Sequence, residues 1–213
     1  WVELAGPAPA LLAASLLSAG AVVEVPWLLF GARFGLDDTG RVLLGAAAVV
    51  WQVAALYAAG GAGLSGTGAR TGFLLAMAGN FGVVLAQDAA SFFSCYALMS
   101  FSAYLLVVER GDAGARRAGR VYVTLVVLGE VLVLSGLLTA AGAGTAAVQS
   151  VPLAGLLLWV GFGIKVGLVP LHPSLPLAYG AAATPGAIAL AGAMVNAGLL
   201  GWLRFLPFGD PAA

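Results

Sequence analysis

Residues 163–176 read Gly-Ile-Lys-Val-Gly-Leu-Val-Pro-Leu-His-Pro-Ser-Leu-Pro, and this stretch decides how the chain is organised. Its lysine, Lys165, interrupts an otherwise uncharged run from Val151 to Val169. An ammonium at the centre of a membrane-spanning helix costs about 2.5 to 3.5 kcal/mol, so a chain that keeps one there usually supplies a partner or a water-filled cavity. Lys165 is therefore a candidate proton carrier inside a membrane.

Three prolines follow the lysine: Pro170, Pro173 and Pro176. Each lacks an N–H and pushes the residue before it out of helical geometry, so the helix that carries Lys165 must break. Because apolar sequence continues beyond the prolines, we expect the break at membrane depth, where non-helical backbone needs cover from protein or a water-filled cavity. His172, the only histidine, lies inside the break and suits a proton relay.

Plainer interpretations of the lysine and the histidine stay open. Lys165 lies only five residues before Pro170, so its long side chain could reach the headgroups of the bilayer. His172 could be a core histidine that donates to a carbonyl freed by the break.

Composition indicates a membrane protein. Of 213 residues, 62% are hydrophobic and 8% are charged, against roughly 45 to 50% and about 25% in soluble domains. The net charge is zero, which gives no basic footprint for nucleic acid. The chain has one cysteine, no nucleophile triad and no cofactor loop, so we expect no cofactor, no metal site and no catalytic site of its own.

The hydropathy pattern predicts an all-α, polytopic membrane fold with about seven transmembrane helices. A span needs about 20 apolar residues, and an open chain in lipid must satisfy its backbone groups as helix. We expect a turn between the third and fourth spans at Gln87 and Asp88. The predicted spans are 8–31, 42–60, 72–87, 89–108, 121–143, 150–170 and 180–204.

The arginines predict the orientation, because short cytoplasmic loops carry an excess of basic residues. The loop 109–120 holds four arginines, and Arg70 lies on the same side. The opposite side has Arg33, Arg41 and Arg204. We therefore expect the loops 61–71 and 109–120 in the cytoplasm.

Two carboxylates are embedded in apolar sequence. Glu130 lies about ten residues from either end of its predicted helix, too deep for its side chain to reach water. A pair between Glu130 and Lys165 would offset the cost of burying both, either as part of a proton relay or as a static clamp between helices. Glu24, Asp88 and Asn196 are secondary candidates, and we expect Asn196 to bond to a neighbouring helix rather than to carry ions.

The motif around Lys165 resembles one family of membrane proteins. It runs from Gly163 through His172 to Tyr179, and Ala-Thr184-Pro and Gly201-Trp-Leu-Arg-Phe205 follow it. Supporting pieces are Leu85-Ala-Gln-Asp-Ala-Ala-Ser-Phe-Phe93 and Phe34-Gly-Leu-Asp37. This pattern is similar to the antiporter-like proton-conducting subunits of respiratory complex I, of membrane-bound hydrogenases of the formate hydrogenlyase type, and of multisubunit sodium/proton antiporters. The sequence Leu175-Pro-Leu-Ala-Tyr179 resembles the hydrogenase branch more closely.

The resemblance implies a domain organisation. Family members contain two inverted five-helix repeats, each with a broken helix that bears a lysine. Residues 72–205 match the whole first repeat, residues 1–71 would form two peripheral transmembrane helices, and residues 206–213 would be a tail. The second repeat is absent, so we expect a fragment or a split subunit.

The family's functional residues carry over in part. Its broken-helix lysine falls on Lys165 and its histidine on His172. The position of its glutamate is Ala97 here, and the position of its next lysine is Asn196. Alanine cannot carry a proton, so the resemblance leaves Glu130 as the candidate partner of Lys165.

Three functions remain open. The first is a proton- or sodium-translocating subunit of a redox-driven, oxidoreductase-like assembly, in the bacterial cytoplasmic membrane and in contact with other membrane subunits, with Lys165, Glu130 and His172 as the relay. The second is a structural subunit whose path has decayed, which Ala97 and Asn196 favour. The third, a stand-alone carrier, is disfavoured by the missing repeat.

Overall fold

Long apolar helices make up most of the structure. The computed structural model describes residues 2–16, 20–29, 31–61, 64, 66–142 and 152–206, so the expected tail lies outside the described residues beyond Leu206. The predicted all-α, polytopic membrane fold is confirmed. Five segments are long and apolar enough to cross a membrane: α3 (Asp38–Ala59), α4 (Thr67–Leu85), α5 (Ala89–Val107), α6 (Ala113–Gly142) and Thr184–Phe205.

The last of these segments is not a uniform α-helix. It begins as α10 (Thr184–Ile188), passes through a π-helical turn, η1 (Ala189–Met194), and ends as α11 (Val195–Phe205). The turn packs against α3 and α4 through the buried side chain of Asn80, which donates to the carbonyl of Ala193 at 3.3 Å and accepts from the indole of Trp51 at 2.9 Å. These bonds hold three spans together where backbone geometry changes.

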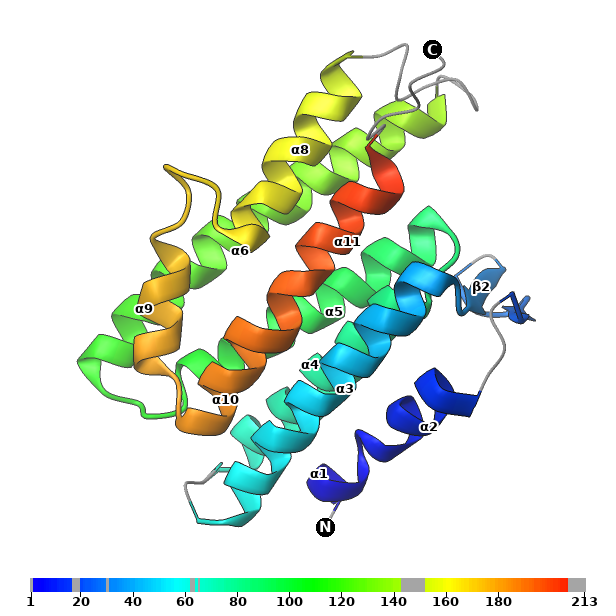
Figure 1. The fold of residues 1–213 in the computed structure, drawn as a ribbon. Coiled ribbons are helices and arrows are strands. Elements are labelled where there is room, and N and C mark those ends of the chain that lie inside the picture. The colour runs from blue at the N-terminus through cyan, green and yellow to red at the C-terminus, as the bar shows by residue number, and fades with distance from the viewer. Residues whose placement is uncertain are drawn as a thin grey trace.

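A discontinuous helix follows α6, as the prolines predict (Figure 1). It consists of α8 (Pro152–Val166), a loop, and α9 (Ser174–Ala181). The break starts before the first proline, at Gly167, which takes a left-handed φ of 95° and donates to the carbonyl of Gly163 at 2.8 Å. Pro176 lies in the first turn of α9, where a missing N–H is tolerated, so it helps to start that helix instead of breaking one.

The expected span over residues 8–31 is wrong. After the single turn α1 (Val2–Ala5), α2 (Ala8–Leu16) has nine residues and reaches only about 14 Å, half of a bilayer core. The chain then forms an antiparallel pair, β1 (Val22–Val25) with β2 (Ala32–Gly35). Gly20 and Gly31 take left-handed φ values of 99° and 102°, which a helix cannot accommodate, and β1 between them is rich in valine. In Figure 1, α2 lies along α3 and the strand pair lies at one end of the bundle.

The arginines of the two predicted loops lie at the same end of the bundle. The helices α3 and α5 end there, and α4 and α6 begin there with Arg70 and Arg116 in their first turns. Arg110 also donates to the carbonyl of Ala182 at 3.2 Å, which brings the junction between α9 and α10 to this end. The predicted turn at Gln87 and Asp88 is confirmed at the opposite end, between α4 and α5.

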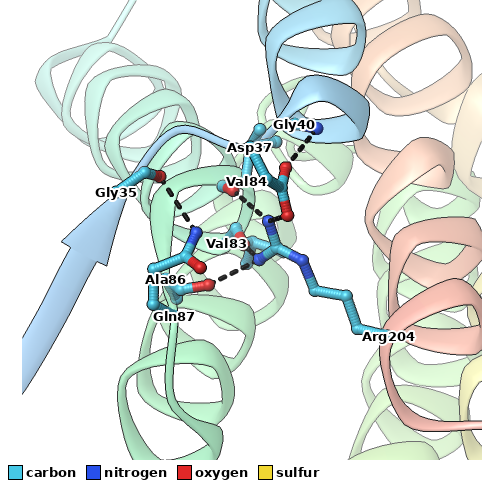
Figure 2. A network of polar contacts seen from close by, with 8 residues as sticks. All are labelled: Gly35, Asp37, Gly40, Val83, Val84, Ala86, Gln87 and Arg204. Atoms are coloured by element: carbon cyan, nitrogen blue, oxygen red, sulfur yellow. Dashed lines mark hydrogen bonds and ion pairs between the residues drawn. The ribbon is translucent and has the colours of Figure 1, made fainter. Parts of the chain in front are cut away.

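A polar network fastens that opposite end (Figure 2). Asp37 caps α3 by accepting from the N–H of Gly40 at 2.5 Å, and Arg204 of α11 donates to the other carboxylate oxygen of Asp37 at 3.2 Å. The same guanidinium donates to the carbonyls at the end of α4, which no helical N–H satisfies. These carbonyls belong to Val83, Val84 and Ala86 at 3.2, 2.8 and 2.5 Å.

Candidate functional site: a buried lysine beside the helix break

Lys165 lies in the last turn of α8, two residues before Gly167, and only 8% of it is exposed. Its ammonium donates to the hydroxyl of Ser100 on α5 at 3.0 Å. It also lies 5.6 Å from the ring centroid of Tyr96 and 6.0 Å from that of Tyr122, within the range of a cation–π contact. The side chain therefore points into the bundle, which contradicts the alternative in which it reaches the headgroups.

Glu130 on α6 is also buried, with 6% exposed, and interacts with both Lys165 and Ser100. Its oxygen Oε2 has no hydrogen-bond partner among the described residues. The direct ion pairs in the described part of the chain are Arg33–Glu24, Arg70–Glu3 and Arg204–Asp37. Glu130 and Lys165 thus share one serine without forming a direct ion pair of their own.

A small cavity joins these groups. It has about 20 Å³ open to the centre of a water molecule, above the roughly 10 to 15 Å³ that one water requires. Its polar lining comes from four helices, including Ser174 at the first turn of α9. The two halves of the broken helix therefore both contribute to the cavity, as in ion sites built from interrupted helices. The polar lining residues are Tyr96, Ser100, Tyr122, Glu130, Lys165 and Ser174.

Glycines bring α6 and α8 close enough to build this site. A Cβ placed on Gly161 of α8 would lie 2.9 Å from the backbone nitrogen of Val133 and 3.0 Å from the carbonyl of Gly129. A Cβ on Gly136 of α6 would lie 2.7 Å from Leu158. Small residues at such positions let transmembrane backbones approach closely, and here they bring the helices of Glu130 and Lys165 together.

The other predicted site residues lie elsewhere. His172 is exposed on the loop of the break, and its imidazole makes no hydrogen bond to Lys165 or Glu130 within the described structure. Asn196 donates to the carbonyl of Gly192 on its own helix at 3.2 Å, so the expectation that it bonds to a neighbouring helix is wrong. Its amide reaches the carbonyl of the preceding turn first, as polar side chains in helices often do.

The two remaining candidate carboxylates are at the end of the bundle that carries the strands. Glu24 is exposed on β1 and pairs with Arg33 at 3.2 Å. Asp88 caps α5, accepting from the N–H of Ser91 at 2.8 Å and from that of Arg33 at 2.9 Å. Burial alone would raise the pKa of Asp88, but the hydrogen bonds from Ser91 and Arg33 lower it below its ordinary value. Asp88 is twelve residues from Ser100 along α5, which is roughly 18 Å.

Sequence reasoning missed the polar residues that surround the lysine. Tyr96 and Ser100 are four residues apart on α5, and both face the cavity. That spacing puts side chains on one helical face, and it is the one signal that could have found them. Ala97 is half-buried beside Tyr96 and does not line the cavity. In the described residues, no three His, Cys, Asp or Glu side chains are grouped as a metal site would require.

Comparisons with known proteins agree with this architecture. The family model described as "NADH:quinone oxidoreductase/Mrp antiporter, TM" matches residues 86–211. An uncharacterised protein of Mycobacterium tuberculosis is 36% identical over 133 residues, covering 58% of this chain and 21% of that protein. Hydrogenase-4 component B of Escherichia coli is 33% identical over 134 residues, covering 57% and 20%. An NAD(P)H-quinone oxidoreductase chain 4 of Picosynechococcus is 31% identical over 147 residues, covering 62% and 26%. The matched part is about a quarter or less of each relative.

Solved structures share the fold over almost the whole chain. The archaeal membrane-bound sulfane sulfur reductase matches with a TM-score of 0.78 at 21% identity, covering 95% of this chain and 45% of that one. The Mrp complex from Dietzia matches with a TM-score of 0.79 at 21% identity, covering 96% and 42%. The chain thus corresponds in fold to somewhat less than half of each of these larger chains.

Proposed function

Because this chain belongs to the NADH:quinone oxidoreductase/Mrp antiporter membrane family, we propose that it moves protons or sodium ions across the membrane as one subunit of a redox-driven assembly. The observation that carries the proposal is the buried pair of Lys165 and Glu130, which share Ser100 and a water-sized cavity beside a helix break. An ionisable residue at membrane depth, paired and next to a cavity, is typical of ion pathways.

The proposed mechanism follows from the cost of burying charge. While Glu130 is ionised, its charge compensates the ammonium of Lys165 across the cavity. When Glu130 takes up a proton, the ammonium loses that compensation and releases its own proton toward the exposed loop, where His172 would receive it. The relay would start at Glu130 on α6, pass through Lys165 at the end of α8, and end at His172 in the loop that follows.

The relatives support the choice of assembly. Their names describe a quinone oxidoreductase chain and a hydrogenase component, and one solved relative is part of a respiratory membrane complex. We therefore propose other membrane subunits as partners and the bacterial cytoplasmic membrane as the location. Residues 72–205 would be the five-helix unit that carries the path.

The test is proton flux through sealed membrane vesicles that contain the full protein with its partner subunits, driven by a pH jump and followed with a pH-sensitive dye. We expect Lys165→Ala to abolish the flux at an unchanged amount of assembled protein. Arg117→Ala, which removes a positive charge from the exposed start of α6, is the control and should keep wild-type flux. Wild-type flux in assembled Lys165→Ala would overturn the proposal and favour the structural role that Ala97 and Asn196 suggest.

A further inference from the structure

Ser100 occupies an unusual position for a serine in a membrane helix. It lies in the middle of α5 and is 1% exposed. Its hydroxyl accepts from the ammonium of Lys165 at 3.0 Å and donates to the carbonyl of Tyr96 at 2.8 Å. The Glu130 carboxylate lines the same small cavity as this hydroxyl. Ser100 thus bonds to one member of the buried pair and shares a cavity with the other.

The surroundings fix the position of this hydroxyl. Tyr122 on α6 donates to the backbone carbonyl of Ser100 at 3.1 Å and so ties α5 to the helix of Glu130. The Tyr96 and Tyr122 rings lie beside the ammonium of Lys165 and line the same small cavity as the polar groups. The hydroxyl hydrogen can rotate about its C–O bond, since a serine has one donor and two acceptor sites. Rotation from the Tyr96 carbonyl to the Glu130 carboxylate needs no movement of the backbone.

We propose that Ser100 is the bridging group through which a proton passes between Lys165 and Glu130; this rests on the ion-translocating function proposed above. In the step toward Glu130, an N–H bond of the ammonium breaks as its proton forms an O–H bond on Ser100. The original O–H bond of Ser100 breaks as that proton forms an O–H bond on the carboxylate. The charged pair becomes a neutral amine and a neutral carboxylic acid. The reverse step restores the charged pair, and it is the direction that returns a proton to Lys165 after its own proton has left toward His172. No electron is transferred and no further reactant is needed.

A solely structural serine would behave differently. In that role Ser100 would only fill space and satisfy the ammonium, so a water in the cavity would carry the proton between lysine and carboxylate. The hydroxyl itself would then be dispensable. A proton bridge instead requires a hydroxyl at this position, whichever small side chain supplies it.

The experiment compares four forms of the full protein in sealed vesicles: wild type, Lys165→Ala, Ser100→Ala and Ser100→Thr. We expect Ser100→Ala to reduce proton flux by about tenfold or more, as loss of a proton-transfer group does, and Ser100→Thr to restore most of it. Infrared difference spectra give a second readout, in which the carboxylic acid band of Glu130 is identified by its loss in Glu130→Gln. We expect this band to weaken in Ser100→Ala and to be retained in Ser100→Thr.

The outcomes separate this inference from the proposed function. Loss of flux in Lys165→Ala with wild-type flux and an unchanged carboxylic acid band in Ser100→Ala would overturn the role of Ser100 alone. Wild-type flux in Lys165→Ala would overturn both. If Ser100→Ala does not assemble, the comparison of Ser100→Thr with Ser100→Cys tests the bridge instead. Cysteine keeps the size of serine but exchanges the hydroxyl for a thiol that forms weaker hydrogen bonds. Equal flux in these two variants would also contradict the bridge.

Discussion

Replacing Arg204 by methionine should destabilise the bundle strongly, because one guanidinium serves three helices (Figure 2). The change removes an ion pair with Asp37 and bonds to the three carbonyls at the end of α4. The adjoining cavity of about 240 Å³ lets water reach the freed groups, so each contact contributes about 1 kcal/mol and the sum is about 3 to 4 kcal/mol. Only 16% of the Arg204 side chain is exposed, which places this value well above that of a surface ion pair.

The assay is reversible unfolding of the purified protein by denaturing detergent, with helix content as the readout. Arg33→Met is the matched control: its ion pair with Glu24 has side chains 53% and 65% exposed, so we expect a loss of about 0 to 1 kcal/mol. Arg204→Lys should recover only part of the loss, because an ammonium cannot reach the carbonyls as a planar guanidinium does. Equal losses in Arg204→Met and Arg33→Met would refute the reasoning.

Two further predictions concern helix contact and a helix cap. Gly161→Ala should lower the free energy of unfolding by about 1 to 3 kcal/mol, because its Cβ would meet the backbone of α6. Gly155→Ala on the same helix is the control: its Cβ meets nothing within 4 Å, so the change should be neutral or stabilising. Unfolding in detergent measures both variants, and equal effects would contradict the close contact. Because the pKa of Asp88 is lowered in the folded protein, its stabilising effect is present above the unfolded value of about 3.9 and is lost as pH falls through the folded value. As pH falls from about 5 to 2, the midpoint temperature of thermal unfolding should therefore decline more in wild type than in Asp88→Asn. Parallel declines in the two proteins would contradict this role of Asp88.

Most of the fold could be predicted because the bilayer imposes simple rules. Apolar length predicted the spans from α3 onward, and the prolines predicted the break, since both follow from backbone hydrogen bonding. The same rules failed at residues 8–31, where hydropathy is high but Gly20 and Gly31 let the chain turn. Hydropathy measures affinity for lipid and does not distinguish a helix from a pair of strands that includes a valine-rich one.

The site could be predicted only where burial is expensive. Lys165 and Glu130 were found because a charge in apolar sequence needs a partner, and the structure brings them to one cavity. Tyr122 carries no such cost, so only the register of α5 against α6 reveals it, and Ser100 has only its spacing from Tyr96 as a signal. Arg204 was counted as a loop charge, although its real partners are carbonyls that the sequence cannot place.

We propose that Glu130 compensates Lys165 as part of a working ion path and is not a static clamp. The most direct measurement is proton flux by the full protein carrying Glu130→Gln, in sealed vesicles and at an amount of assembled protein equal to wild type. Glutamine keeps the shape and hydrogen-bonding capacity of the side chain but cannot take up and release a proton. We predict that flux is lost, and wild-type flux in Glu130→Gln would contradict the account.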